Sequence, residues 1–409
     1  MKILFVVFSL LGSFYFLFKK RKADLYTLAF FSALIYFSPG FFGYVVYPGR
    51  IPKLIHEQVY VVFTMVIVVI IIGAMAKDVA RRPRQKPPYK ILGTEYYEEV
   101  LAIIGLTLML YQISKVNRFL LSPKNVLMPL LGSSFVLMRY SASLAFLTSF
   151  MSDKRKTLWA SSVVLVFTFL IGFRGPIALT GLALILLVFR DLRAAPLVSY
   201  YKFALPVGFF GYVMAMGKVF YGSFKTFGLR VALSRLFDFE FMLIAFMSLE
   251  PFSVQTILNE IIVTNFHIGF AHLKNIIYQV LVVPSLFGAD SQAFNIAFQT
   301  QLFPEVKYGM AYNIWGEALA SGGYPFLLLV VTCYVIGLSF FDRLQASNNP
   351  IVQACATYMG VYWGFFIHRS SIATQLTYQR HLLYVVSIGV VGSMVLRGLR
   401  KLGLKKYYH

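Results

Sequence analysis

The stretch QVYVVFTMVIVVIIIGAMA, residues 58–76, decides the fold class, because it carries no charged side chain over its whole length. At a rise of about 1.5 Å per residue, a helix of this length crosses the roughly 30 Å hydrocarbon layer of a membrane. Lipid offers the backbone no hydrogen-bond partners, so such a segment must be helical. The basic stretch KDVARRPRQKPPYK, residues 77–90, follows at once and is typical of the cytoplasmic end of a span.

The rest of the chain repeats this pattern of apolar runs that end in basic clusters. Of its 409 residues, 58% are hydrophobic and 13% are charged, and the mean hydropathy is +0.71, which exceeds what a soluble core requires. A net charge of +22 suggests nucleic-acid binding in a soluble protein, but these basic residues lie in short clusters between apolar runs. We therefore expect anionic membrane lipid, and no nucleic acid, as their partner.

The basic clusters divide the chain into about eleven predicted membrane-spanning helices, with the amino terminus outside and the carboxyl terminus in the cytoplasm. The predicted spans are 3–18, 25–47, 58–76, 97–113, 126–150, 158–173, 176–189, 199–217, 320–341, 351–367 and 381–397. We predict an all-α, polytopic transmembrane helical bundle that forms a single domain over residues 1–409. Residues 218–319 are less apolar and predict one large outer loop, whose amphipathic or re-entrant helices would bring the bundle to about 11–13 spans.

Arginine side chains at predicted outer helix ends are the first candidates for a binding site. They are Arg174 in IGFRGPIALTG, Arg230 or Arg235 in GLRVALSRLFDFE, and Arg369 in FFIHRSSIATQL. A single arginine of this kind is usually an interfacial anchor. Several that converge on one cavity suit a diphosphate, because the guanidinium offers paired donors and stays charged when partly desolvated.

Other polar groups lie within or at the start of predicted spans. Arg139 falls near the middle of a span, where a charge costs at least about 2.5–3.5 kcal/mol, so it must face protein or water. Both a structural pairing, with a carbonyl or with a carboxylate such as Glu317, and a substrate contact remain open for it. In KYGMAYNIWGEALASGGYPFLLL, residues 307–329, Tyr312 and Asn313 precede Glu317, which is either a base for a sugar hydroxyl or the counter-ion of the arginines.

The histidines offer candidate bases but no metal site. His368 and His381 lie next to Arg369 and Arg380, and either could serve as a base near neutral pH, although a lone interfacial histidine is more often inert. The sequence contains no HExxH, CxxC or glycine-rich nucleotide loop. We therefore expect no metal and no cofactor, and a substrate that arrives already activated.

At these positions the chain resembles the bacterial O-antigen and polysaccharide repeat-unit polymerases of the Wzy type, which are related to the O-antigen ligases. The resemblance consists of an Arg-Gly at the start of a span, a long outer loop, an Asn-x-x-Gly-Glu followed by Gly-Gly, and a late outer arginine. The residues that carry it are Arg174, Gly175, Asn313, Gly316, Glu317, Gly322, Gly323 and Arg369.

The resemblance implies a fold like the GT-C glycosyltransferases in the bacterial inner membrane, with a periplasmic loop and active face. It implies the metal-independent transfer of a growing glycan from undecaprenyl diphosphate to a sugar hydroxyl on a lipid-linked repeat unit. Arg174, Arg369 and Arg235 would bind the diphosphate leaving group, and Glu317 or a nearby base would deprotonate the acceptor. The remaining candidates for substrate binding are Arg230, Arg139, Asn313, Tyr312 and His368. A separate chain-length regulator protein is the further partner that the family pattern implies.

Three other functions compete with this interpretation. An O-antigen ligase carries His-Asn where this chain reads Tyr312 and Asn313, which favours the polymerase. A flippase or other transporter of lipid-linked oligosaccharide would be built from paired repeats with broken helices at matching positions, and the sequence gives no sign of them. A membrane acyltransferase would need a histidine inside a span, whereas most of the histidines fall in loops or at span ends.

Overall fold

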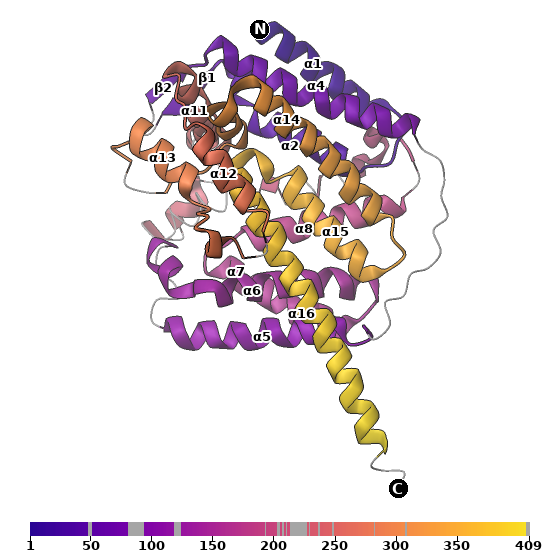
Figure 1. The fold of residues 1–409 in the computed structure, drawn as a ribbon. Coiled ribbons are helices and arrows are strands. Elements are labelled where there is room, and N and C mark those ends of the chain that lie inside the picture. The colour runs from indigo at the N-terminus through magenta and orange to yellow at the C-terminus, as the bar shows by residue number, and fades with distance from the viewer. Residues whose placement is uncertain are drawn as a thin grey trace. The chain divides into compact units, whose positions relative to one another are not determined.

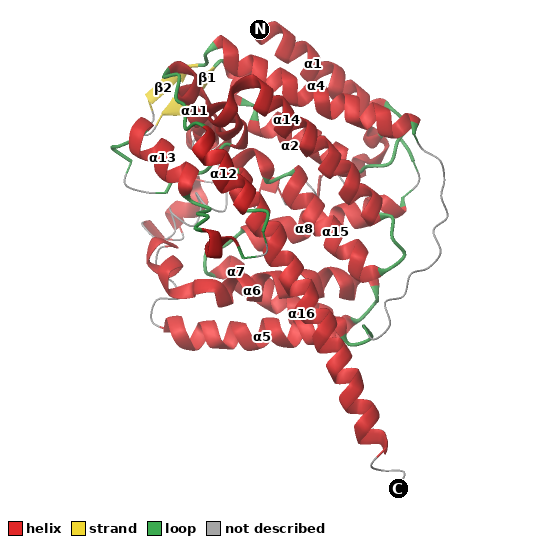
Figure 2. Cartoon of the chain, in the orientation of Figure 1, coloured by secondary structure: helices red, strands yellow, loops and turns green. Residues whose placement is uncertain are grey.

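The computed structural model describes most of the chain. The described residues are 1–47, 51–80, 94–117, 124–192, 194–202, 205–206, 208–209, 211–212, 227–228, 230–235, 238–247, 249–281, 283–306 and 309–405. Helices dominate these residues, with one pair of strands among them (Figure 2). The all-α prediction is therefore confirmed except for this small hairpin.

The elements follow one another along the chain as labelled in Figure 1. The amino-terminal half contains α1 (Lys2–Phe18), α2 (Leu25–Tyr36), α3 (Pro39–Phe42), β1 (Tyr44–Tyr47), β2 (Ile51–Leu54), α4 (Glu57–Val79), α5 (Tyr97–Val116), α6 (Lys124–Met151), α7 (Arg155–Leu170), α8 (Gly175–Asp191) and the short 3-10 helix η2 (Leu197–Tyr200). The second half contains α10 (Phe239–Met247), α11 (Glu250–Val263), α12 (Phe270–Tyr278), η3 (Pro284–Phe287), α13 (Ala293–Leu302), α14 (Ile314–Gln345), α15 (Pro350–Gly364), η4 (Ile367–Arg369) and α16 (Ile372–Lys405).

The chain forms two compact units, each assembled from three separate stretches. The first unit consists of Met1–Arg81, Phe189–Ser339 and Tyr362–Thr377, and the second of Arg82–Val188, Phe340–Val361 and Tyr378–His409. Each unit is described by itself below.

In the described part of the chain, five helices are long and apolar enough to cross a membrane. They are Glu57–Val79, Tyr97–Val116, Pro129–Met151, Ile314–Gln345 and Ile372–Leu402, and each matches a predicted span. Three shorter apolar helices, Lys2–Phe18, Leu25–Tyr36 and Gly175–Arg190, also match predicted spans in position. This set of helices is compatible with a multi-pass membrane protein.

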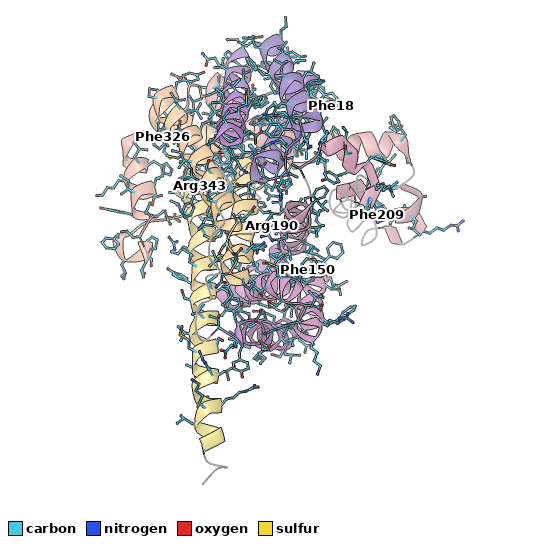
Figure 3. The ribbon with its side chains drawn as sticks, turned by 90° about the vertical axis from the view of Figure 1, so that its right-hand side faces the viewer. Phe18, Phe150, Arg190, Phe209, Phe326 and Arg343 are labelled. Carbon is cyan, nitrogen blue, oxygen red and sulfur yellow. The ribbon has the colours of Figure 1, made fainter. Side chains whose placement is uncertain are left out.

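Helix α1 exposes apolar side chains, as expected for a helix that contacts lipid. Its exposed residues Ile3, Leu10 and Phe14 are 78%, 64% and 67% accessible, and they recur at helical spacing on the side away from the core. Figure 3 shows two further exposed aromatic side chains, those of Phe18 and Phe209. Apolar surface of this extent is costly in water and suits contact with lipid.

The prediction of one span over residues 25–47 is wrong. Helix α2 ends at Tyr36, and a new short helix begins at Pro39, which has no backbone N–H to continue the first one. Gly43, at φ +87°, ends that helix in the left-handed region, and the chain continues as β1. Strand β1 pairs antiparallel with β2, from Tyr44 opposite Leu54 to Tyr47 opposite Ile51.

The last helix begins earlier than predicted. Its first residue is Ile372, because the Ser371 hydroxyl accepts a hydrogen bond from the Thr374 backbone N–H and caps the helix. The first ten residues of α16 include several polar ones, which lower the local hydropathy. The sequence pattern therefore predicts the span only from 381 to 397. In the predicted span 199–217, residues 203–204, 207, 210 and 213–217 lie outside the described residues.

The region 218–319 contains four described helices, α10 to α13, as its amphipathic pattern predicted. Helix α11 is the central one, and it contacts α2, α3, α4, α13, β1 and η4 within the first unit. Side-chain bonds fix the hairpin to it: Thr256 donates to the Val46 carbonyl at 2.8 Å, and Lys53 pairs with Glu260 at 3.1 Å. Helix α11 and the hairpin therefore belong to the packed core of the first unit, whichever side of a membrane the region 218–319 faces.

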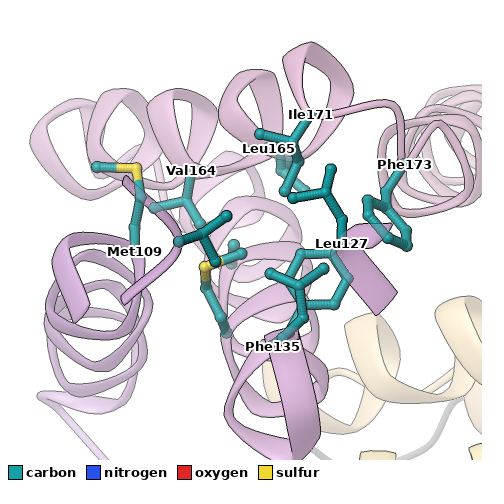
Figure 4. Close-up of a cluster of buried hydrophobic side chains, with 11 residues drawn as sticks. Met109, Leu127, Phe135, Val164, Leu165, Ile171 and Phe173 are labelled. Carbon is teal, nitrogen blue, oxygen red and sulfur yellow. The ribbon is translucent and has the colours of Figure 1, made fainter. Parts of the chain in front are cut away.

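In the second unit, α5, α6 and α7 pack together around a hydrophobic cluster (Figure 4). Met109 of α5, Phe135 of α6 and Val164 of α7 are among its members. Phe173, in the turn between α7 and α8, joins the cluster with its ring 4.6 Å from that of Phe135. The turn between α7 and α8 contains Phe173 and Arg174, and Gly175 is the first residue of α8.

Two long helices are broken at a glycine. In α6 the break is at Gly132, with φ 62° and ψ −164°, three residues after Pro129. In α14 it is at Gly322 and Gly323, and Gly323 has φ 65° and ψ −161°. These dihedral angles belong to a region that is essentially restricted to glycine. The sequence predicted the Gly-Gly turn of α14 but not the break in α6.

Candidate functional site

The sequence Asn-x-x-Gly-Glu lies at the start of α14, and its asparagine caps that helix. The Asn313 side-chain oxygen accepts a hydrogen bond from the Gly316 backbone N–H at 3.0 Å. Its amide nitrogen donates to the Val254 carbonyl at 3.0 Å and to the side-chain oxygen of Gln255 at 3.3 Å. Asn313 is fully buried, so it holds the start of α14 against α11.

Gly316 allows α11 and α14 to approach closely. A Cβ atom at this position would lie 2.8 Å from the Cδ1 atom of Ile261 on α11. Only hydrogen fits there without movement of the isoleucine. The two small or polar residues of the motif, Asn313 and Gly316, therefore bring the next residue, Glu317, into the core of the first unit.

Glu317 is fully buried, and both of its carboxylate oxygens have partners. Oε1 lies 2.8 Å from Nε2 of His272 on α12, and Oε2 accepts a hydrogen bond from the Ile372 backbone N–H at 2.6 Å. Ile372 is the first residue of α16, where the free N–H groups and the helix dipole favour a negative charge. Glu317 thus connects α12, α14 and α16, the helices labelled in Figure 1.

His272 is the partner of Glu317 that the sequence did not single out. It lies in the first turn of α12, and only 3% of its side chain is exposed. Its ring packs 5.9 Å from the ring of Phe294 on α13, which belongs to a buried aromatic cluster. Just before α12, the Ile268 backbone N–H donates to the Ala320 carbonyl at 3.0 Å and ties this segment to α14.

Arg369 lies in η4, immediately before α16. Its guanidinium forms an ion pair with Glu250 at the start of α11 and stacks on the Phe366 ring, 4.6 Å from the ring centre. The side chains of Arg369 and Glu250 are 28% and 37% exposed, so this pair is partly open to solvent. Arg369 is three residues from Ile372, whose N–H binds Glu317.

His368 is enclosed by aromatic rings and fully buried. Trp315 donates its indole N–H to Nδ1 of His368 at 3.2 Å, which leaves the proton of the neutral ring on Nε2. The rings of Tyr36 and Phe37 lie 5.5 Å and 5.2 Å from the His368 ring. The sequence made His368 a candidate for substrate contact, and its surroundings are those of a packed core histidine.

The other predicted substrate-binding residues in the first unit lie apart along the chain. The Tyr312 hydroxyl donates to the Gln292 side chain. Arg235 stacks on the rings of Phe227 and Phe241, 4.4 Å and 5.2 Å from their centres, and Arg230 is exposed. These contacts give the Arg235 guanidinium an aromatic support.

Arg174 and Arg139 belong to the second unit. Arg174 stands directly before α8, and its carbonyl accepts the Ala178 N–H at 3.0 Å, as expected for a helix start. The Arg139 guanidinium stacks on the rings of Tyr140 and Tyr378, 4.9 Å and 5.9 Å from their centres. That either arginine acts together with Glu317 and Arg369 stays a prediction.

Tyr47 on β1 connects the β-hairpin to residues at and just after the end of α13. The Tyr47 hydroxyl of β1 donates to Glu305 at 2.8 Å and to the Leu302 carbonyl at 3.2 Å. Burial, together with the hydrogen bond to Glu305, raises the pKa of Tyr47 to about 12. The hairpin is therefore joined to α13 as well as to α11.

Among the described residues, no three His, Cys, Asp or Glu side chains come together in a way that could hold a metal ion. Comparisons with protein family models, with curated proteins and with solved structures found no match for this chain. The function must therefore be argued from the residues of the site.

Proposed function

We propose that this protein is a membrane glycosyltransferase that polymerises oligosaccharide repeat units carried on undecaprenyl diphosphate. It would act en bloc, on the periplasmic face of a bacterial inner membrane, with the diphosphate lipid as the leaving group. The proposal includes a fold like the GT-C glycosyltransferases. The observation that carries it is the buried Glu317–His272 pair, bound to the first N–H of α16, three residues after Arg369.

This junction combines the two chemical functions that the reaction needs. The acceptor sugar hydroxyl attacks the anomeric carbon of the donor glycan, the bond from that carbon to the diphosphate oxygen breaks, and the hydroxyl proton passes to a base. The carboxylate–histidine pair supplies proton-accepting capacity. A nearby arginine stabilises the negative charge that develops on the leaving diphosphate.

Arg369 is suited to an anion that arrives from outside. Its present partner, Glu250, is a single carboxylate in a partly exposed ion pair, and such pairs contribute little net stability. A diphosphate offers more oxygens and more charge than one carboxylate, so it competes well for the guanidinium fork. Arg174, at the start of α8, is proposed to bind the same diphosphate.

The test is chain growth by the purified protein in detergent, with undecaprenyl-diphosphate oligosaccharide as the substrate and without nucleotide or added metal. We expect the wild-type protein to form products longer than a single repeat. Arg369→Ala and Arg174→Ala should abolish growth, whereas Arg343→Ala, which removes an exposed arginine of α14, should leave it unchanged. Persistence of single repeats with wild-type protein would reject the polymerase.

One structural observation favours the second candidate, a transporter of the same lipid. Gly132 in α6 and Gly323 in α14 break their helices with nearly identical dihedral angles, and the two breaks fall in different units. Discontinuous helices are common at the substrate sites of transporters. Movement of the labelled lipid across liposomes by protein that shows no chain growth would select this function.

A further inference from the structure

We propose that His272 is the general base of the reaction and that Glu317 positions it. This assignment rests on the proposed glycosyltransferase function and names the group that takes the acceptor proton. The sequence motif directs attention to Glu317, but the geometry points to its partner on α12.

Glu317 is poorly placed to take a proton from a substrate. Its side chain has no exposed surface, and its two oxygens are occupied by His272 and by the Ile372 N–H. A sugar hydroxyl could reach it only after one of these bonds breaks. His272 is also buried, but its bond to Glu317 uses only Nε2 and leaves Nδ1 outside that bond.

The hydrogen bond to Glu317 also selects the reactive form of the ring. Nε2 of His272 faces a carboxylate oxygen at 2.8 Å, so the proton of the neutral imidazole lies on Nε2 and the lone pair lies on Nδ1. Nδ1 is then the atom that can accept a proton. When it does, the adjacent carboxylate stabilises the imidazolium, as in other catalytic histidine–carboxylate pairs.

The ring is held in place from several directions. Phe294 packs against it, Glu317 holds Nε2, and the bond from the Ile268 N–H to the Ala320 carbonyl fixes the approach to α12. Gly269, at φ +74°, lets the chain turn into α12 just before His272. A base that is positioned before the substrate arrives loses little entropy in the reaction.

The proposed reaction transfers one proton to His272 and one glycan to the acceptor oxygen. The O–H bond of the acceptor breaks, and its proton moves to Nδ1 of His272. The freed oxygen forms a bond to the anomeric carbon, and the bonding electrons of the donor's carbon–oxygen bond leave with the diphosphate. Arg369, in the segment directly before α16, is proposed to neutralise that charge.

The experiment compares His272→Ala, Glu317→Gln, the double variant and His267→Ala in the detergent chain-growth assay. His267 is exposed and lies five residues from His272, so it is a matched control. We expect His272→Ala to lower kcat by about 100- to 10,000-fold while KM stays close to wild type. Its melting temperature should fall, because Glu317 loses a buried partner, so kcat is compared at a temperature at which both proteins are folded. Glu317→Gln should also lower kcat, and the double variant should be no slower than His272→Ala alone, because Glu317 acts through the histidine.

Two outcomes separate the two proposals. If the wild-type protein elongates the glycan and His272→Ala does so at the same rate, His272 is not the base, although the proposed function stands. If the wild-type protein forms no chains, the proposed function itself fails. A folded Glu317→Gln variant that is much slower than His272→Ala would make Glu317 the base instead.

Discussion

The break in α14 gives a prediction whose size can be worked out from the backbone. Gly323 has φ 65° and ψ −161°, and a Cβ atom there would lie 3.8 Å from its nearest neighbour, the Cδ atom of Pro325. The site therefore has space for a methyl group but not the right conformation. We expect Gly323→Ala to destabilise the protein by about 1–3 kcal/mol, the usual cost of a side chain in this region.

The matched control is Gly398→Ala on α16. Gly398 is exposed and helical, has no positive φ, and has nothing within 4 Å of an added Cβ. Alanine is favoured over glycine inside a helix by about 0.5–1 kcal/mol, so this variant should be slightly more stable than wild type. The two substitutions are chemically the same and should move stability in opposite directions.

Thermal unfolding in detergent, followed by tryptophan fluorescence, measures both variants. Trp315 lies in the short amino-terminal part of α14 and contributes to this signal together with Trp159 and Trp363. Equal melting temperatures for Gly323→Ala and wild type would refute the argument, because they would mean that α14 continues through Gly323 as an ordinary helix. A fall in chain growth without a fall in stability would show that the break positions Glu317.

Three further predictions test other parts of the fold. Gly316→Ala should cost about 1–3 kcal/mol by crowding Ile261, and adding Ile261→Val, which removes the Cδ1 atom, should recover part of the melting temperature. Asp24 is buried and binds Arg21 at 2.9 Å and Lys77 at 2.6 Å, so Asp24→Asn should cost about 3–5 kcal/mol at pH 7. Burial opposes ionisation of Asp24, but Lys77 and Arg21 hold its pKa below the ordinary value. The stabilisation that the Asp24 carboxylate gives the folded protein is therefore present above about pH 4 and is lost as the pH falls through the lowered pKa. Melting temperatures at pH 7 and pH 3 should show the gap between Asp24→Asn and wild type closing in acid. Finally, a cysteine at Gly175, which is exposed, should react with a membrane-impermeant thiol reagent from the periplasmic side, and labelling from the cytoplasmic side alone would reverse the predicted orientation.

The sequence predicts the long helices well, because apolar runs of sufficient length have one stable form in lipid. The start and end of α4 and the hairpin of α7 and α8 follow from hydropathy and from basic clusters alone. Hydropathy fails where a polar side chain caps a helix or a proline interrupts one. Ser371 begins α16 among polar residues, and Pro39 divides a run that is apolar throughout.

The site is less predictable than the fold, because its key contact joins residues that are far apart in sequence. His272 and Glu317 are 45 positions apart and lie on different helices. One local signal was present: the buried positions of the α12 segment, His272 and Gln279, are seven residues apart and therefore lie on the same helix face. When a short helix buries a histidine at a position where leucine is expected, that histidine has a hydrogen-bond partner in the core.

Each member of the Asn-x-x-Gly-Glu motif has a structural role that needs no chemistry. Asn313 caps α14, Gly316 admits Ile261, and Glu317 binds the first N–H of α16. The motif alone is therefore a sign of this helix junction, whatever reaction takes place beside it. His272 also has a structural role, because its Nε2 atom binds a carboxylate oxygen of the buried Glu317. The bond to Glu317 uses Nε2 and leaves Nδ1 of the ring outside it, and this makes His272, more than the motif, the residue on which the enzyme proposal should be tested first.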